Sequence, residues 1–232
     1  MEFTKSLIKG KLVKRYKRFF VDVKLSKEIV TAHCPNTGSM KGLLDAGNEV
    51  YISKNDDPKR KLKYTLEIIK AKNKLIGVNT HFANKIAQRG LSTNLIKELA
   101  NSDSIKPEVF FNKETRFDFL IEKKKQKIFV EVKNVTLCRN KEIAEFPDSV
   151  TTRGSKHLKT LIEAIKKGYK SYLLFLVQIQ DVENFKIAKD IDKEYYENYL
   201  LAKKAGVIFL AYRCKISSKE IKIEKKIKII ND

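Results

Sequence analysis

The sequence has no tryptophan and few of the residues that usually build a covalent or metal-bound scaffold. Its three cysteines, Cys34, Cys138 and Cys214, are far apart and odd in number, and there are only three histidines. These counts argue against a disulfide framework, and without a Cys-x-x-Cys or His-x-x-x-His pair a zinc site is not expected. We expect buried free thiols in a reducing compartment.

Long apolar runs are also missing. No segment approaches the ~18 consecutive apolar residues of a membrane span. The first residues, MEFTKSLIKGKLVKRYKRFF, lack the apolar core of a signal peptide. No Walker or Rossmann glycine motif occurs. These absences predict a cytoplasmic protein with no membrane partner.

Acidic residues are scarce relative to basic ones. The chain has 28 Asp and Glu against 49 Lys and Arg, for a formal net charge of +21. Such an excess favours a polyanionic partner, and we expect DNA, with single-stranded DNA or RNA as alternatives. Lysine supplies most of the positive charge, which A/T-rich coding bias also produces, but bias alone does not explain the shortage of acids. Composition leaves the oligomeric state open, a homodimer included.

Residues 1–80 alternate apolar and polar positions in short runs separated by turns. Five or so short strands in this span predict a small β-barrel of the OB type. Within it, Arg15, Tyr16, Lys17 and Arg18 interleave basic and aromatic side chains, as OB surfaces do when they stack bases and follow a nucleic-acid backbone. The alternative is an ordinary strand with Tyr16 in the core and its basic neighbours in water.

Residues 81–232 change to a mixed pattern. A helix begins near Asn79 and is expected to break near Gly90, and three strands follow, at 108–111, 117–121 and 128–135. Later elements are a helix capped by Thr151 or Thr152 and ending at Gly168, strands at 172–179 and 207–212, and a helix at 194–205. The order αβββαβ, followed by αβ, is that of the PD-(D/E)xK nuclease fold. The basic tail beyond Arg213 fits either an edge strand or a phosphate-contacting arm.

A candidate catalytic set lies in the stretch RFDFLIEKKKQKIFVEVKNVTL. It predicts two strands joined by a charged turn. In the second strand the period of two places its valines on one face and Glu131 and Lys133 on the other, while Asp118 in the first strand faces away from its apolar neighbours. If the strands pair, two carboxylates and one ammonium converge beside a sheet. The spacing D-x12-E-x-K is that of the PD-(D/E)xK superfamily.

These residue types suit hydrolysis of a phosphodiester. Asp118 and Glu131 would ligate Mg²⁺ or Mn²⁺, which prefer hard oxygen ligands and bridge to phosphate. Lys133 would position or help deprotonate a water and offset charge in the transition state. The alternative is a solvated sheet face with a cross-strand ion pair of little energetic value.

Further residues extend this candidate site. Glu98, expected on the preceding helix, is a candidate fourth catalytic residue, because first-helix carboxylates often complete such sites in the superfamily, and Glu108 is a weaker option. Arg116 adjoins the first metal ligand and is a candidate phosphate contact. Arg153 and Lys156 lie near a predicted helix N-terminus, which also favours anions.

Two other residues near this helix are expected to have structural roles. Asp148 is expected to close the preceding loop, and His157 to orient or pack rather than to ligate. In the first domain, HCPNTGSMKG predicts a tight loop that either offers N–H groups to a phosphate or only shapes the barrel.

Several longer blocks carry a family resemblance: RYKRFFVDV, HCPNTGSMKGLL, VNTHFAN, RFDFLIE, EVKNVTL and FPDSVTTRGSKHLKTL. With these blocks the chain resembles the sugar fermentation stimulation protein (SfsA) family, and the resemblance runs over essentially its whole length. It implies a two-domain α+β protein, an OB-like barrel at 1–80 followed by a PD-(D/E)xK nuclease-like domain at 81–232, that binds DNA and is linked to sugar metabolism, maltose in particular.

Three functional hypotheses follow. The first is a DNA-binding protein with a metal-dependent phosphodiesterase site. The second is a DNA-binding regulator of sugar metabolism genes that does not use this site catalytically. The third is a basic RNA-binding or assembly module.

Overall fold

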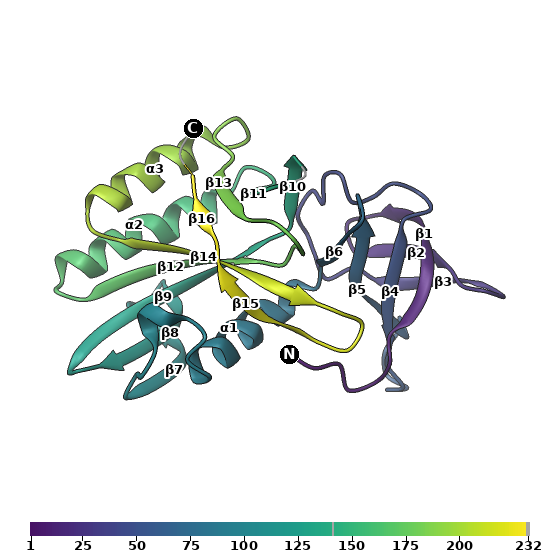
Figure 1. Ribbon diagram of the computed structural model, residues 1–232, viewed down its shortest axis with the longest axis horizontal. Coiled ribbons are helices and arrows are strands. Elements are labelled where there is room, and N and C mark those ends of the chain that lie inside the picture. The colour runs from purple at the N-terminus through teal and green to yellow at the C-terminus, as the bar shows by residue number, and fades with distance from the viewer. Residues whose placement is uncertain (141, 231–232) are drawn as a thin grey trace.

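A computed structural model describes residues 1–140 and 142–230 (Figure 1). Two lobes follow one another along the chain. The first is a β-barrel and the second a mixed α/β domain, which confirms the fold expected from the sequence. None of the helices in the described ranges is both long and apolar enough to cross a membrane.

The barrel forms because its strands alternate buried and exposed positions, which places one face of each strand inside. Val21 and Val23 of one strand and Val50 and Ile52 of another fill the interior. The sheet order is β3-β2-β1-β4-β5-β6, and a parallel pairing of β3 with β5 closes five strands into a ring. The strands are β1 (Ile8–Tyr16), β2 (Phe20–Lys24), β3 (Ile29–His33), β4 (Glu49–Lys54), β5 (Tyr64–Ala71) and β6 (Lys74–Gly77).

The second domain is built on a six-stranded sheet in the order β15-β14-β12-β9-β8-β7. Strands β9, β12 and β14 are parallel, and β12 is almost wholly apolar, as expected of a strand covered on both faces. The strands are β7 (Ser104–Phe110), β8 (Arg116–Lys123), β9 (Gln126–Val135), β12 (Lys170–Val177), β14 (Ile208–Ile216) and β15 (Ile221–Lys226).

Helices cover both faces of this sheet (Figure 1). Helices α2 (Thr152–Lys166) and α3 (Lys193–Lys204) pack on one face, and α1 (Ala83–Ser92) packs on the other. Thr151 caps α2 as expected, since its side chain accepts a hydrogen bond from the N–H of Gly154. Two short 3-10 helices, η1 (Thr80–Phe82) and η2 (Lys97–Leu99), flank α1.

A small second sheet was not expected from the sequence. Its order is β10-β11-β13-β16, and its strands are only two to four residues long, too short for a clear alternation pattern. The strands are β10 (Leu137–Asn140), β11 (Ile143–Phe146), β13 (Asn184–Ile187) and β16 (Lys228–Ile229).

Two expectations about local structure need revision. Gly90 does not interrupt the first helix. It lies inside α1, where a Cβ atom would come within 2.4 Å of Ile223 Cδ1, so its lack of a side chain allows the helix to approach β15. The basic tail, expected as an edge strand or a phosphate-contacting arm, does contribute an edge strand. Its residues 221–226 form β15, and Lys222, Lys225 and Lys226 make ion pairs within the protein.

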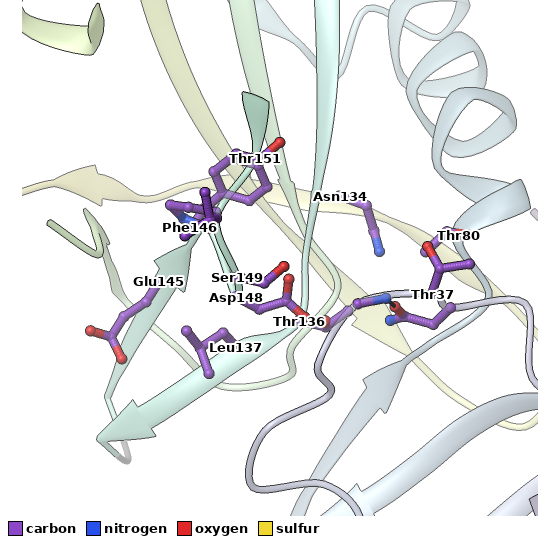
Figure 2. Close-up of a pocket in the computed structure, with 14 residues that line it drawn as sticks. Thr37, Thr80, Asn134, Thr136, Leu137, Glu145, Phe146, Asp148, Ser149 and Thr151 are labelled. Atoms are coloured by element: carbon purple, nitrogen blue, oxygen red, sulfur yellow. Dashed lines mark hydrogen bonds between the residues drawn. The ribbon is translucent and has the colours of Figure 1, made fainter. Parts of the chain in front are cut away.

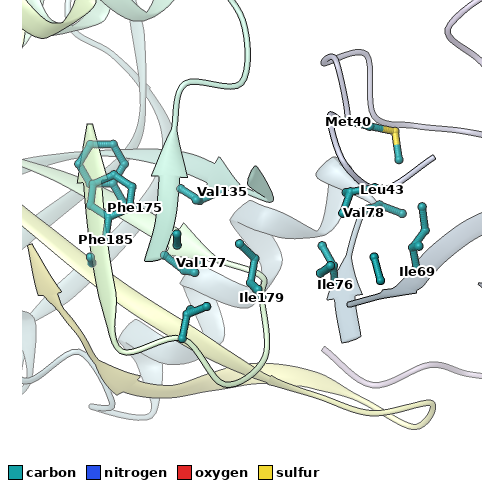
Figure 3. Packing of buried hydrophobic residues seen from close by; sticks show 14 of the residues in the cluster. Met40, Leu43, Ile69, Ile76, Val78, Val135, Phe175, Val177, Ile179 and Phe185 are labelled. Atoms are coloured by element: carbon teal, nitrogen blue, oxygen red, sulfur yellow. The ribbon is translucent and has the colours of Figure 1, made fainter. Parts of the chain in front are cut away.

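The two lobes share one apolar core (Figure 3). Met40, Ile69 and Ile76 from the barrel belong to the same buried cluster as Val177 and Ile179 from the second domain. Strand β6 continues this contact through the backbone, because the N–H of Gly77 donates to the carbonyl of Gln178 at 3.0 Å. The barrel is therefore packed as a fixed neighbour of the α/β domain.

Candidate active site

Asp118 lies where strands β8 and β9 separate. Their pairing runs from the turn only as far as Phe119 opposite Val130, and Asp118 is the next residue of β8. Its Oδ2 accepts a hydrogen bond from the N–H of Val132 at 2.7 Å, so the carboxylate replaces the missing main-chain partner. Its Oδ1 accepts from Asn84 Nδ2, also at 2.7 Å. These two bonds fix the carboxylate at the opening between the strands.

Glu131 and Lys133 of β9 face α2, whereas the neighbouring valines face α1, as the period of two predicted. Lys133 Nζ donates to Glu131 Oε1 at 2.8 Å, and the same oxygen contacts Nδ1 of His157 at a short distance. His157 Nδ1 also lies 3.0 Å from Lys133 Nζ. Glu131 is only 3% exposed. His157, expected to orient or pack, contacts both other members of this buried trio.

The two carboxyl groups have opposite pKa shifts. Burial and the nearby Glu131 charge raise the pKa of Asp118 to about 6. Burial opposes ionisation of Glu131, but the Lys133 ammonium and His157 hold its pKa below the usual value. Glu131 thus has the Lys133 ammonium at 2.8 Å, whereas for Asp118 the same ammonium offsets only part of the effect of burial on the pKa. A cation placed beside both groups would relieve this repulsion.

The residues fit a divalent metal in their chemistry. The candidate ligands are two carboxylates, and Mg²⁺ usually binds through one or two carboxylates while keeping waters and contacting phosphate. Within residues 1–140 and 142–230, no group of three or more His, Cys, Asp or Glu side chains is arranged to hold a metal. Asp118 and Glu131 would therefore be the only charged protein ligands, and the ion pair from Lys133 to Glu131 Oε1 would have to rearrange.

This electrostatic arrangement predicts a stability effect in Asp118→Asn. The folded protein binds more protons than the unfolded chain between the ordinary pKa of 3.8 and about 6, so the Asp118 contribution to stability falls as the pH rises through that window. At pH values above this window, Asp118→Asn removes the unfavourable carboxylate charge, so the Tm of the variant in EDTA should exceed that of the wild type by about 5 °C. The Tm increase caused by Mn²⁺ in the wild type should disappear. Scanning calorimetry at pH 5 and 7.5 measures both.

The control for this experiment is Glu114→Gln. Glu114 is an exposed residue at the rim of the cavity that Asp118 also lines, so the substitution removes a nearby carboxylate that is not buried. The Glu114→Gln substitution should change neither the Tm in EDTA nor the Tm increase caused by Mn²⁺. An Asp118→Asn protein that still gained thermal stability from Mn²⁺ would contradict the assignment of Asp118 as a metal ligand.

A cavity of about 690 Å³ opens over Asp118 and His157. Arg116, Arg153 and Lys156, the three residues expected to contact phosphate in this domain, all line it. Arg116 pairs with Glu108 at 2.8 Å and Lys156 with Glu114 at 3.0 Å. Exposed pairs of this kind contribute little free energy, so a phosphate can replace the carboxylates at small cost.

Phe110 lines the same cavity and was missed in the sequence analysis. It is 68% exposed at the end of β7, and the guanidinium of Arg116 lies 5.7 Å from its ring centre. An exposed aromatic ring beside cationic side chains is the arrangement on which single-stranded bases stack. Its position beside Phe111 in the expected strand at 108–111 resembled core in the sequence, and only the structure separates the exposed Phe110 from the half-buried Phe111.

The structure does not bring Glu98 to this site. It lies in η2 rather than in α1, and its carboxylate accepts hydrogen bonds from Tyr212 at 2.7 Å and Lys226 at 2.5 Å. These residues belong to β14 and β15, which β12 and β9 separate from β8. The expectation that Glu98 sits on the preceding helix and joins the catalytic set is therefore wrong. The residue from α1 that reaches Asp118 is Asn84.

The basic and aromatic residues of the barrel have mixed environments. Arg15 donates to the carbonyls of Asn36 and Gly38 at 2.8 and 3.0 Å, so its guanidinium holds a loop of the barrel. The half-buried Tyr16 ring stacks on Phe20 with centroids 5.5 Å apart. Lys17 and Arg18 are exposed at the β1–β2 turn. Nucleic-acid contact by these four residues stays a prediction.

A second cavity, of about 270 Å³, lies between this barrel loop and the loop before α2 (Figure 2). Asp148 crosses between the domains, because its backbone carbonyl accepts from Ser39 Oγ at 2.8 Å and its Oδ2 lies 3.3 Å from the N–H of Met40. Its role is thus to join two loops from different domains. Asn134, the residue after Lys133, also lines this cavity, which places the interdomain opening next to the candidate catalytic strand.

Comparisons with known proteins cover both lobes. Residues 81–220 match the description "Sugar fermentation stimulation protein RE domain", and residues 13–78 match "SfsA N-terminal OB domain". Two similar relatives are named "Sugar fermentation stimulation protein homolog". One, from Pelagibacter ubique, is 84% identical over all of both chains. The other, from Maricaulis maris, is 43% identical over 99% of this chain and 98% of its own.

A solved structure shares the whole fold. It is described as "The structure of Pyrococcus Furiosus SfsA in complex with Ca2+" and is 27% identical in sequence. Its TM-score is 0.88, and the match covers 100% of this chain and 98% of that one. That related protein is described in complex with Ca²⁺.

Proposed function

The chain belongs to the sugar fermentation stimulation protein (SfsA) family, and from that premise we propose that it binds DNA and hydrolyses phosphodiester bonds with a divalent metal. The observation that carries this proposal is the half-buried Asp118 carboxyl beside Glu131 and Lys133 at the opening between β8 and β9. The Ca²⁺ in the related structure supports the metal requirement. Mg²⁺ or Mn²⁺ is the ion we expect to support cleavage.

Each residue has a separate role in this proposal. Asp118 and Glu131 would hold the ion, which when bound supplies Lewis-acid stabilisation of charge on phosphate. Lys133 orients a water and offsets negative charge in the transition state. His157 holds Glu131 and Lys133 in place from α2.

The cavity rim would position the substrate. Arg116, Arg153 and Lys156 exchange their carboxylate or imidazole neighbours for backbone phosphates. Phe110 offers its exposed ring to an unpaired base. This combination favours a single-stranded segment or a frayed duplex end over a continuous duplex.

A second candidate function is a non-catalytic DNA-binding regulator of sugar metabolism genes, maltose genes among them. The close contacts of Glu131 Oε1 with both Lys133 and His157 favour it, because a carboxylate engaged in this way binds a metal only after rearrangement. This alternative predicts DNA binding without cleavage under any metal.

A cleavage assay separates the two functions. Purified protein is incubated with labelled single strands, duplexes, frayed ends and RNA, each with Mg²⁺, Mn²⁺, Ca²⁺ or EDTA. We expect cleavage with Mg²⁺ or Mn²⁺, fastest on unpaired DNA, and none in Asp118→Ala. Phe110→Ala should reduce the preference for unpaired strands without abolishing cleavage of duplex. Binding of all substrates with no cleavage under any metal would refute the nuclease proposal and favour the regulator.

A further inference from the structure

A third cavity, polar and of about 560 Å³, lies between the barrel, the N-terminal segment and the start of α1. It is separate from the residues assigned to cleavage. Two of the sequence blocks that carry the family resemblance meet in it, since His33 comes from HCPNTGSMKGLL and Asn79 and His81 from VNTHFAN. The proposed nuclease function uses neither of these two histidines.

Cationic side chains outnumber acidic ones in the lining of this cavity, where the carboxylates are those of Glu2 and Glu67. Lys54, Arg60 and Lys85 line it, and in the described part of the chain none of the three forms an ion pair with a carboxylate. Burial and the nearby Arg60 and His81 lower the pKa of His33, which places these three groups within electrostatic reach of one another. Gathering cations and imidazoles in one cavity costs free energy that a bound anion would offset.

The floor of the cavity is a built polar network. Glu67 is 3% exposed, and its two oxygens accept from Ser53 Oγ at 2.6 Å and Asn79 Nδ2 at 2.8 Å. Asn79 in turn accepts from the N–H of His81 at 3.1 Å. Glu67 therefore positions the segment that carries His81. Burial raises the pKa of its carboxyl group, and the two hydrogen bonds and the nearby Arg60 offset part of that effect.

The walls limit what can enter. The N-terminal segment is tied down on one side, because the Met1 ammonium donates to the carbonyl of Ile221 at 2.6 Å. Phe3 and Phe82 pack edge to face with centroids 6.1 Å apart. The volume is within the range of small-molecule sites and suits a nucleotide-sized group rather than a bare ion.

We propose that this cavity binds a phosphate monoester, with Arg60, His33 and His81 around the phosphate and Phe82 beside the attached nucleoside. A monoester carries up to two negative charges, whereas a backbone diester carries one, so a cluster of cations favours a strand end or a free nucleotide over internal phosphates. The first turn of α1 links this cavity to the cleavage site, because Lys85 lines it while the adjacent Asn84 bonds Asp118.

The inference rests on the proposed function only in taking nucleic acid as one source of the phosphate, and it is tested without cleavage. Fluorescence anisotropy in EDTA compares single strands carrying a 5′-phosphate, a 3′-phosphate or hydroxyl ends. We expect one phosphorylated end to bind on the order of 10-fold tighter than hydroxyl ends. AMP and inorganic phosphate serve as competitors: competition by AMP identifies a free nucleotide as a ligand, and its failure identifies the strand end.

Matched variants decide whether this cavity is responsible. Arg60→Ala and His81→Ala, both at solvent-accessible positions, should each remove most of the preference for the phosphorylated end. Lys61→Ala removes one charge from the same exposed loop but lies outside the cavity, and it should preserve the preference. Equal binding of phosphorylated and hydroxyl ends by the wild type, or a preference unchanged in Arg60→Ala and His81→Ala, would overturn the proposal. Neither result depends on whether Asp118 and Glu131 support cleavage.

Discussion

Lys133→Ala is expected to slow metal-dependent DNA cleavage by about 10²–10⁴-fold while leaving DNA affinity nearly unchanged. The ammonium lies 2.8 Å from Glu131 inside the candidate site, and the Lys133 side chain is only 12% exposed. Its loss removes the group that orients water and offsets charge in the transition state. Single-turnover cleavage rates and anisotropy titrations on the same substrate measure the two effects.

Lys127→Ala is the matched control for this prediction. Lys127 lies on the same strand β9 but is exposed near the β8–β9 turn, outside the cavity over Asp118. Its substitution should change cleavage by less than about 2-fold, as expected of a surface residue away from special features. If Lys133→Ala cleaved as fast as Lys127→Ala, the lysine would have only a structural role beside Glu131.

DNA affinity is expected to fall by about 10³–10⁵ between 50 and 200 mM salt. This range corresponds to roughly 6–10 phosphate contacts, each of which releases condensed counterions. The net charge of +21 and the cationic rim at Arg116, Arg153 and Lys156 are the physical basis. Fluorescence anisotropy across a salt series gives the slope of log K against log salt.

The rim residues should contribute a defined part of that slope. Replacing Arg116, Arg153 and Lys156 together by alanine should reduce its magnitude by about 3, close to one per lost contact. The control is a triple alanine variant at Lys193, Lys203 and Lys204, exposed residues of α3 outside the cavity. A flat salt response in the wild type would mean that the basic excess reflects coding bias.

Local pattern was enough to define the strand that carries the candidate catalytic residues. The period of two in β9 separated Glu131 and Lys133 from the valines, because successive side chains of a strand point to opposite faces whatever the rest of the fold does. Hydrophobic periodicity likewise predicted α2 and α3 within a few residues. Thr151, one of the two threonines expected to cap α2, is its N-cap. Strands as short as β10 and β16 carry too few residues for such a signal.

The neighbours of each side chain depend on how distant segments pack. Glu98 looked suitable as a carboxylate near the first helix, but the order of strands in the sheet holds it against Tyr212 and Lys226. Asn84 reaches Asp118 instead, and His157 reaches Glu131 from a helix 26 residues further along the chain. No spacing rule predicts such contacts, because they depend on the register and separation of paired strands.

By itself, therefore, the sequence determined which residues share a strand face, the two-lobed architecture and the excess of positive charge, all of which follow from local periodicity and composition. Only the tertiary structure decided that β8 leaves β9 at Asp118, that Phe110 is exposed beside Arg116, and that a cationic cavity lies between the barrel and α1. The first two features come from how β8 pairs with β7 and β9 inside the second domain, whereas the cavity arises where the barrel packs against α1. Local periodicity shows neither where a strand pair separates nor how two domains pack.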